Sequence, residues 1–210
     1  TYHDKNQLFG KIQTFTTFNE LNSILHKVLN LDFYGLDSIV YSPVAYKFTP
    51  QMHKDHPNLA TKLSKGNEFE IKTNVFDTIS EVFYDDKPND GNDYVRLLGR
   101  KNNDRIFKYI REEYVFNETN LTKYKVFIPE ANGSGAIGEV LSTPLIGEPL
   151  IGHTQTFISL GAFETRQEAE NLMKYVKTKF CRVMLGTLKV TQHNSISTWK
   201  NVPLQDFTPN

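Results

Sequence analysis

Two stretches of the chain carry apolar residues at helical spacing. The first covers residues 17–30 and begins with Thr17-Phe-Asn-Glu20, the spacing of a capping box, in which side chain and backbone bind each other across the first turn. The second begins with another capping box, Thr165-Arg-Gln-Glu168, and its apolar stripe continues to Gly186. We therefore predict a helix over each stretch, the second being the longest in the chain.

Other stretches alternate polar and apolar residues and are rich in β-branched and aromatic side chains, a pattern typical of strands. The stretches that we expect to be extended are 36–46, which Pro43 interrupts, 69–76, 79–84, 94–98, 124–128 and 156–160.

Four segments are predicted to lie outside strands. Residues 51–67 are polar and contain proline and glycine, which indicates a long loop. Asn103 has the character of an N-cap and predicts a short helix with Ile106, Phe107 and Ile110 facing inward. Residues 132–152 are rich in glycine and proline, which favours an exposed loop, and the tail 199–207 is predicted to be irregular.

The pattern contains no internal repeat, linker or low-complexity tract, so we expect residues 1–210 to form one α+β domain. Its core is predicted to be a mainly antiparallel or mixed sheet with a few packed helices. The 15 Phe and 10 Tyr residues supply enough apolar surface to argue against disorder. Because the chain begins at Thr1 without methionine, we expect it to be a fragment of a longer protein.

Compartment and redox chemistry follow from what the sequence lacks. No stretch approaches the roughly 20 consecutive apolar residues of a membrane span, and the first residues are polar. Cys181, the single cysteine, has no partner for a disulfide and is predicted to be a small buried apolar residue. We therefore expect a cytoplasmic protein that does not enter a membrane.

The net charge is zero, with 24 Lys and Arg residues against 24 Asp and Glu residues, but the charges are unevenly distributed. Residues 96–111 hold six basic residues and one acid, and residues 166–200 hold seven basic residues and two acids. The compensating acids concentrate in residues 77–93. The basic stretches are either ordinary solvated faces or surfaces that bind phosphate groups.

Several motifs suggest chemistry that their context does not support. Gly133-Ser-Gly-Ala-Ile-Gly138 matches the dinucleotide-binding glycine pattern, but Pro129 ends the preceding strand early and no helix is predicted after it. The better use of such a backbone is close approach to a phosphate or a base edge. His53 and His56 lack a third zinc ligand near them. We expect no metal site and no catalytic group in this chain.

One enzymatic alternative stays open. Asp55 with Glu70-Ile-Lys72 resembles the arrangement of Mg²⁺-dependent nucleases, in which two carboxylates hold the ion and a lysine steadies the attacking water. Charged alternation of this kind is equally typical of a half-exposed strand.

The C-terminal third carries the remaining polar constellation. Lys174, Lys177, Lys179 and Arg182 lie off the apolar stripe of the predicted long helix. After Gly186 follow Lys189, Thr191, Gln192, His193 and Asn194, whose donors and acceptors suit phosphates and base edges. The same residue types are common at ordinary helix ends.

Five segments together resemble a known class of protein. They are Tyr124-Lys-Val-Phe-Ile-Pro-Glu-Ala-Asn-Gly-Ser-Gly135, Thr154-Gln-Thr-Phe157, Glu168-Ala-Glu170, Tyr175-Val-Lys-Thr-Lys-Phe180 and Val202-Pro-Leu-Gln-Asp-Phe-Thr208. In this order they resemble the C-terminal target recognition domain of type II adenine-specific DNA methyltransferases of restriction-modification systems. The resemblance extends from about Arg96 to the end, with a weaker match at Phe33-Tyr-Gly-Leu36.

This resemblance implies a sequence-specific module for double-stranded DNA. An adjoining domain would bind S-adenosylmethionine and methylate a flipped adenine; its catalytic Asn/Asp-Pro-Pro-aromatic motif is absent here, so the chain alone is expected to be inert and to bind no cofactor. The expected partners are duplex DNA, the methyltransferase domain and a restriction subunit. An alternative function is a protein-interaction module that docks restriction subunits. The neutral net charge is the feature that fits least well.

The long helix and residues 96–111 are expected to hold phosphates, while the glycine-rich loop and residues 192–194 approach the bases. The residues predicted to contact DNA are Arg100, Lys101, Lys125, Asn132, Gly133, Ser134, His153, Gln155, Lys177, Arg182, Lys189, Thr191, Gln192, His193 and Asn194.

Overall fold

The computed structural model describes residues 18–116, 119–133, 137, 141–189 and 191–209. Within these ranges the α-helices are α2 (Asn19–Leu29), α3 (Pro50–Asp55), α4 (Val75–Thr78), α5 (Arg166–Val176) and α6 (Lys179–Gly186). Short 3-10 helices are η1 (Leu36–Ile39), η2 (Pro57–Lys62), η3 (Ser80–Val82), η4 (Glu112–Tyr114) and η5 (Ile196–Trp199). The strands are β1 (Val40–Tyr41), β2 (Lys47–Phe48), β3 (Tyr94–Lys101), β4 (Asp104–Arg111), β5 (Val115–Phe116), β6 (Tyr124–Pro129), β7 (Leu145–Gly147), β8 (Ile151–His153) and β9 (Phe157–Phe163).

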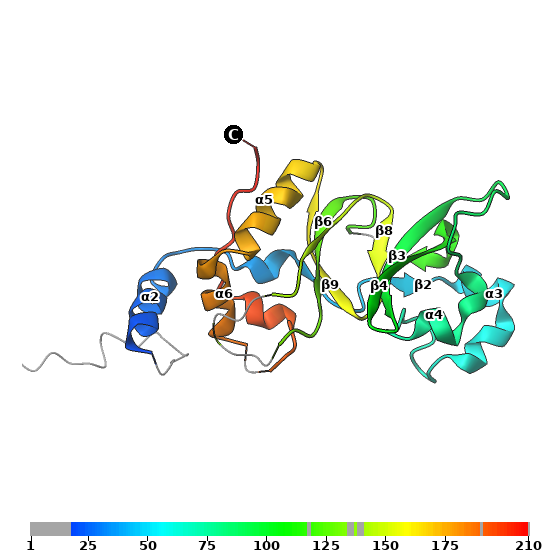
Figure 1. The fold of residues 1–210 in the computed structure, drawn as a ribbon, viewed down its shortest axis with the longest axis horizontal. Helices are drawn as coiled ribbons and strands as arrows, with labels where there is room; N and C mark the ends of the chain where they lie inside the picture. The colour runs from blue at the N-terminus through cyan, green and yellow to red at the C-terminus, as the bar shows by residue number, and fades with distance from the viewer. Residues whose placement is uncertain (1–17, 117–118, 134–136, 138–140, 190, 210) are drawn as a thin grey trace, which may run out of the picture.

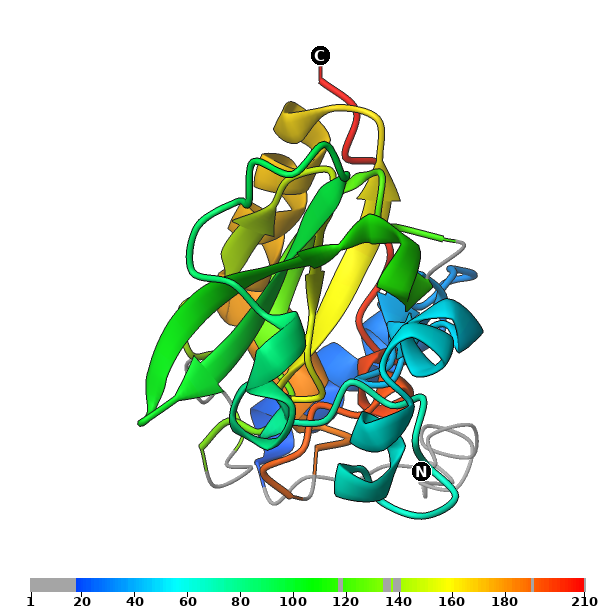
Figure 2. The same ribbon diagram turned by 90° about the vertical axis from the view of Figure 1, so that its right-hand side faces the viewer.

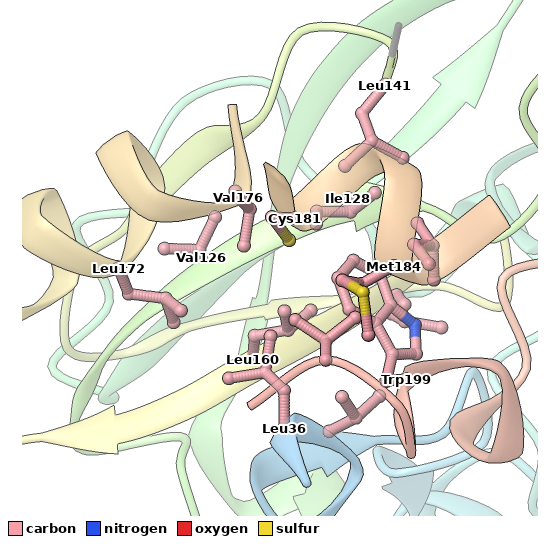
Figure 3. Packing of buried hydrophobic residues seen from close by; sticks show 14 of the residues in the cluster. Leu36, Val126, Ile128, Leu141, Leu160, Leu172, Val176, Cys181, Met184 and Trp199 are labelled. Carbon is pink, nitrogen blue, oxygen red and sulfur yellow. The ribbon is translucent and has the colours of Figure 1, made fainter. Parts of the chain in front are cut away.

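One half of the molecule is an antiparallel sheet covered by helices. Its strand order is β1-β9-β6-β7, and α5 packs against β6 and β7 (Figure 1). Because side chains alternate along a strand, Val126, Ile128 and Leu160 share the face that meets the helices. Leu172, Cys181 and the fully buried Trp199 complete this core (Figure 3).

The other half is built on a mixed sheet of order β4-β3-β8, in which β3 pairs antiparallel with β4 and parallel with β8. The short helices α3 and α4 and the β2-β5 pair surround it (Figure 1). Its separate core includes Phe48, Met52, Phe76, Leu97 and Ile110.

A small third cluster joins the halves. Leu98 and Ile151 come from the mixed sheet, and Phe127 and Phe157 come from the antiparallel sheet. These residues lie on the sheet face opposite the helices, so β6 and β9 are buried on both sides. The predicted class, an α+β domain with antiparallel and mixed sheets and a few packed helices, is confirmed. In the part of the chain that the structure describes, no helix combines the length and apolarity that crossing a membrane requires.

The predicted helix at Asn103 is wrong. β3 continues through Gly99 to Lys101, and a two-residue turn leads into β4, with Lys101 paired to Asp104. Asn102 and Asn103 have φ of 50° and 69°, the left-handed conformation that both central residues of a type I′ hairpin turn require and that asparagine tolerates better than most residues.

The prediction of one long C-terminal helix is correct about where the helix begins, but the stretch forms two helices instead of one. The Thr165–Glu168 capping box is present, but α5 ends at Val176, and Thr178 accepts a hydrogen bond from the backbone N–H of Cys181 to cap a second helix, α6. The apolar stripe is continuous in sequence because both helices face one core. At the other predicted helix, α2 forms, but its N-cap position is Phe18, without a side-chain cap; Thr17, the predicted cap, lies outside the described residues.

Residues 51–84 are also organised differently from the prediction. Thr49 caps α3 through the Met52 N–H, so the expected loop is largely α3 and η2. The two strands predicted over 69–84 do not form: this stretch holds the short helices α4 and η3, turns, and isolated bridges at Glu70 and Tyr84. The buried apolar residues that alternate with polar ones in this stretch all pack into one core, although they lie on short helices and turns. Alternation of apolar and polar residues therefore does not by itself imply a strand.

Some of the remaining predictions are confirmed and others are wrong. Residues 94–98, 124–128 and 156–160 are extended as predicted, and the tail after Trp199 is irregular. Residues 36–46 form η1 and only the short β1. The described part of the glycine-rich stretch 132–152 contains β7 and most of β8, so it is not a loop throughout.

Candidate nucleic-acid interface

The start of the glycine-rich loop lies directly beside the segment that follows α6. An isolated antiparallel bridge pairs Ala131 with His193. The backbone N–H of Asn132 donates to the carbonyl of Gln192 at 2.7 Å, and Lys189 Nζ donates to the carbonyl of Asn132 at 2.8 Å. The structure therefore brings together two of the segments that the sequence singled out.

The β3-β4 hairpin is tied to the same region. Arg105 Nη1 donates to the carbonyl of Thr143 at 2.6 Å. The neighbouring Ser142 donates from its backbone N–H to Asn132 Oδ1 at 2.5 Å, and its hydroxyl binds the same oxygen. These hydrogen bonds, together with the peptide bond between Ser142 and Thr143, connect the hairpin to Gln192. The hairpin turn and the chain after α6 lie on the lower side of both views (Figures 1 and 2).

We define the candidate interface as the surface formed by Arg100, Arg105, Gly133 and residues 191–193; Lys101, the register partner of Asp104, lies on the other face of the hairpin. Except for the half-buried Arg105, these residues are exposed. Lys101 Nζ lies 3.1 Å from Asp77 Oδ1, and His193 Nδ1 lies 2.7 Å from Glu130 Oε1. Gly133 has φ of 60°, a conformation that glycine adopts without strain.

Three predicted DNA contacts at this place have a supporting role instead. Asn132 and Lys189 are each 5% exposed and Asn194 is fully buried. Asn194 Nδ2 donates to the carbonyl of Pro129 at 2.8 Å. These side chains hold the two segments together, so their polar groups face the protein and not a ligand.

Lys125, another predicted DNA contact, is buried between the two sheets. Its position on β6 alternates with Val126, so it lies on the face away from the helices. Lys125 Nζ donates to the carbonyls of Asn120, Leu121, Lys123 and Glu148 at 2.8–3.1 Å. Burial lowers the pKa of this amine to about 7. Its role is to hold backbone together at the centre of the molecule.

His153 is likewise fully buried, at the end of β8. Its Nδ1 lies 3.0 Å from the carbonyl of Thr154, which accepts only, so Nδ1 carries the proton and Nε2 accepts from the Ser159 hydroxyl at 3.2 Å. Burial, reinforced by the nearby charge of Lys125, lowers the pKa of His153 to about 3. The ring is therefore neutral at physiological pH and remote from solvent.

The hydrogen bonds around His153 form one directed chain. The Tyr46 hydroxyl donates to Asn120 Oδ1 at 2.5 Å, and Asn120 Nδ2 donates to Ser159 Oγ at 3.0 Å. Ser159 in turn donates to His153. Although a serine beside a histidine can indicate a nucleophile, all of these groups are buried, so they stabilise the junction of the two sheets.

The other predicted contacts are scattered. Gln155 Nε2 donates to Glu70 Oε2 at 2.8 Å. Lys177 is exposed at the end of α5, and Arg182 is half-buried on α6. Ser134 lies outside the described residues. The structure does not bring Gln155, Lys177 or Arg182 into contact with the candidate interface through any bond among the described residues.

The residues of the nuclease and zinc alternatives make contacts with different partners. Asp55 accepts from Gln51 Nε2 at 2.8 Å and from the Tyr114 hydroxyl at 2.9 Å, which lowers its pKa, whereas Glu70 binds Gln155 and Lys72. His53 Nε2 lies 3.1 Å from the carbonyl of Glu68. Across the described ranges, no three or more His, Cys, Asp or Glu residues form a group that could hold a metal ion.

Sequence reasoning missed the hairpin turn as part of the site. Arg105 was expected on a helix and Asn102 was not considered. A signal was present, because two adjacent asparagines between alternating stretches are compatible with a type I′ turn.

A scan against protein-family models and searches of curated proteins and of solved structures gave no match.

Proposed function

We propose that this chain is the DNA target recognition module of an adenine-specific methyltransferase of a restriction-modification system. The observation that carries the proposal is the connection, by hydrogen bonds and one peptide bond, from Arg105 through Thr143, Ser142 and Asn132 to Gln192. It places exposed cations at one end of a surface and exposed hydrogen-bonding side chains at the other. Such a combination suits a phosphate backbone and the base edges beside it.

Within this proposal the cations supply affinity and the polar side chains supply selectivity. Arg100 and Arg105 would neutralise phosphates and release counterions, which makes binding dependent on salt. Gln192 would contact a base edge, and a good contact of this kind contributes about 1–3 kcal/mol of discrimination. Methyl transfer, S-adenosylmethionine binding and any cleavage would belong to adjoining or partner polypeptides.

The test is selection and binding with the complete chain. Selection from a pool of randomised duplexes should yield a preferred sequence, and fluorescence anisotropy with that duplex should give an affinity that falls as salt rises. The variant Gln192→Ala should lose about 5- to 150-fold in affinity for the preferred duplex. Gln205→Ala is the matched control, because Gln205 is an exposed glutamine on the C-terminal tail and lies outside the candidate interface.

Two results would overturn the proposal. One is the absence of any preferred sequence. The other is cleavage of plasmid by the purified chain with Mg²⁺ that is lost in Glu70→Gln, which would support the nuclease alternative.

A further inference from the structure

The turn end of the β3-β4 hairpin projects from the rest of the molecule. Each strand has eight residues, about 27 Å at the usual rise per residue. Burial decreases toward the turn: Tyr94 and Ile110 near the base are buried, whereas residues 100–104 are all exposed. In Figure 2 the hairpin projects to the lower left, beyond the neighbouring elements.

The charges of the hairpin are divided between its two faces. On the face that carries Leu97, Lys101 pairs with Asp77 and Lys108 pairs with Asp85. The opposite face carries Arg96, Arg100 and Arg105, and none of these three forms an ion pair with a described residue. Unneutralised positive charge is therefore concentrated on one face.

Two of these arginines lie directly opposite each other. Arg100 and Arg105 are register partners in the antiparallel pair, where like charges are unfavourable. Arg105 is held by the carbonyl of Thr143 and lies over the Phe157 ring, 5.7 Å from its centroid. Arg105 is thus held in place opposite Arg100, an arrangement that an anion between or beside the guanidinium groups would stabilise.

The turn itself presents two unused amides. Asn102 and Asn103 are exposed, and neither side chain makes a hydrogen bond to any residue that the structure describes. Glycine would satisfy the backbone of the second turn position better than asparagine. A side-chain amide can bind adenine through a paired donor and acceptor in the major groove.

From these observations we propose that the hairpin enters the major groove of DNA, where Asn102 and Asn103 contact base edges and Arg100 and Arg105 hold the flanking phosphates. A two-stranded ribbon fits the width of this groove. The inference rests on the proposed function and names its recognition element.

The experiment uses the preferred duplex selected above and three variants of the complete chain. Asn103→Gly retains a favourable type I′ turn, so it should leave the unfolding midpoint unchanged or raised while affinity for the preferred duplex falls about 5- to 150-fold. Arg100→Gln should reduce the magnitude of the slope of log affinity against log salt by about 1. Lys108→Gln, on the acid-paired face, should leave the slope unchanged.

The groove is identified by chemical substitution in the DNA. Replacing single purines of the preferred duplex by 7-deazapurines removes a major-groove acceptor. At one position this replacement should weaken binding of the unaltered chain to the duplex. It should not weaken binding of the Asn103→Gly variant any further. If the unaltered chain shows a preferred sequence while Asn103→Gly, Arg100→Gln and every 7-deazapurine leave binding unchanged, the hairpin inference is overturned and the proposed function stands. Failure of the unaltered chain to select any sequence overturns the proposed function itself.

Discussion

Individual polar residues gave the least reliable predictions. Lys125 and His153 have the side chains of a DNA-binding surface, yet both are fully buried. Their strands are covered on both faces, one by helices and one by the other sheet. A polar residue on such a strand is indistinguishable in sequence from one on a half-exposed strand, because the second covering layer comes from distant residues.

The buried histidine predicts how stability depends on pH. Its pKa is about 3 in the folded chain against 6.5 when exposed, so the unfolded chain binds an additional proton between these values. Stability is therefore lost as pH falls below about 6.5, by up to about 1.4 kcal/mol per pH unit from this group.

Urea unfolding at pH 7, 6 and 5 should measure this loss, and His153→Gln should show a smaller one over the same range. The folded pKa of Lys125 is about 7, so its contribution is nearly constant below that pH. If the free energy of unfolding depends equally on pH in the unaltered chain and in His153→Gln, His153 is not held neutral.

At the scale of elements, start signals were more reliable than continuity. The capping box at Thr165 gave the correct start of α5, because it is a local pattern of donors and acceptors. The break at Thr178 was missed since an apolar stripe reports the face that is buried and not whether the backbone is continuous. Asn103 was assigned to a helix because asparagine favours both N-caps and left-handed turns.

The break between α5 and α6 gives a prediction for Thr178. Its hydroxyl accepts from the N–H of Cys181 at 3.1 Å, so Thr178→Ala should lower the free energy of unfolding by about 1 kcal/mol. Thr178→Ser retains the acceptor and should retain most of the stability. Chemical denaturation of the three proteins measures this, and equal losses in both variants would exclude capping as the cause.

For the whole molecule, the neutral net charge resolves into a spatial division. Two acids of residues 77–93, Asp77 and Asp85, lie against one face of the hairpin, where they bind Lys101 and Lys108. Asp90 instead binds Tyr94 and Arg111 at the base of the hairpin. The sequence shows that the acidic and basic stretches exist, but strand periodicity and the hairpin register decide which cations are neutralised. The segments of the candidate interface could be predicted from sequence, whereas their joining through Thr143 depends on tertiary packing.

The junction between the halves predicts cooperative unfolding. Leu98 is fully buried there against Phe127 and Phe157, and Leu98→Ala should cost about 2–5 kcal/mol. Trp199 lies in the core between the antiparallel sheet and the helices. The unfolding transitions followed by its fluorescence and by far-ultraviolet circular dichroism should shift to the same lower urea midpoint. Leu31→Ala, at a residue 66% exposed, is the control and should change little. Separate transitions for the two probes would show that the halves unfold independently.

The path of the backbone between the halves has a consequence for how such a chain can change. β1 belongs to one sheet and β2 to the next pair, and the chain returns for β6 and β7, leaves for β8 and returns again for β9. Neither half is a continuous piece of sequence, so recombination cannot exchange one half for a homologous segment without removing strands from both. A crossover between two such chains therefore leaves strands of different parentage side by side within each half.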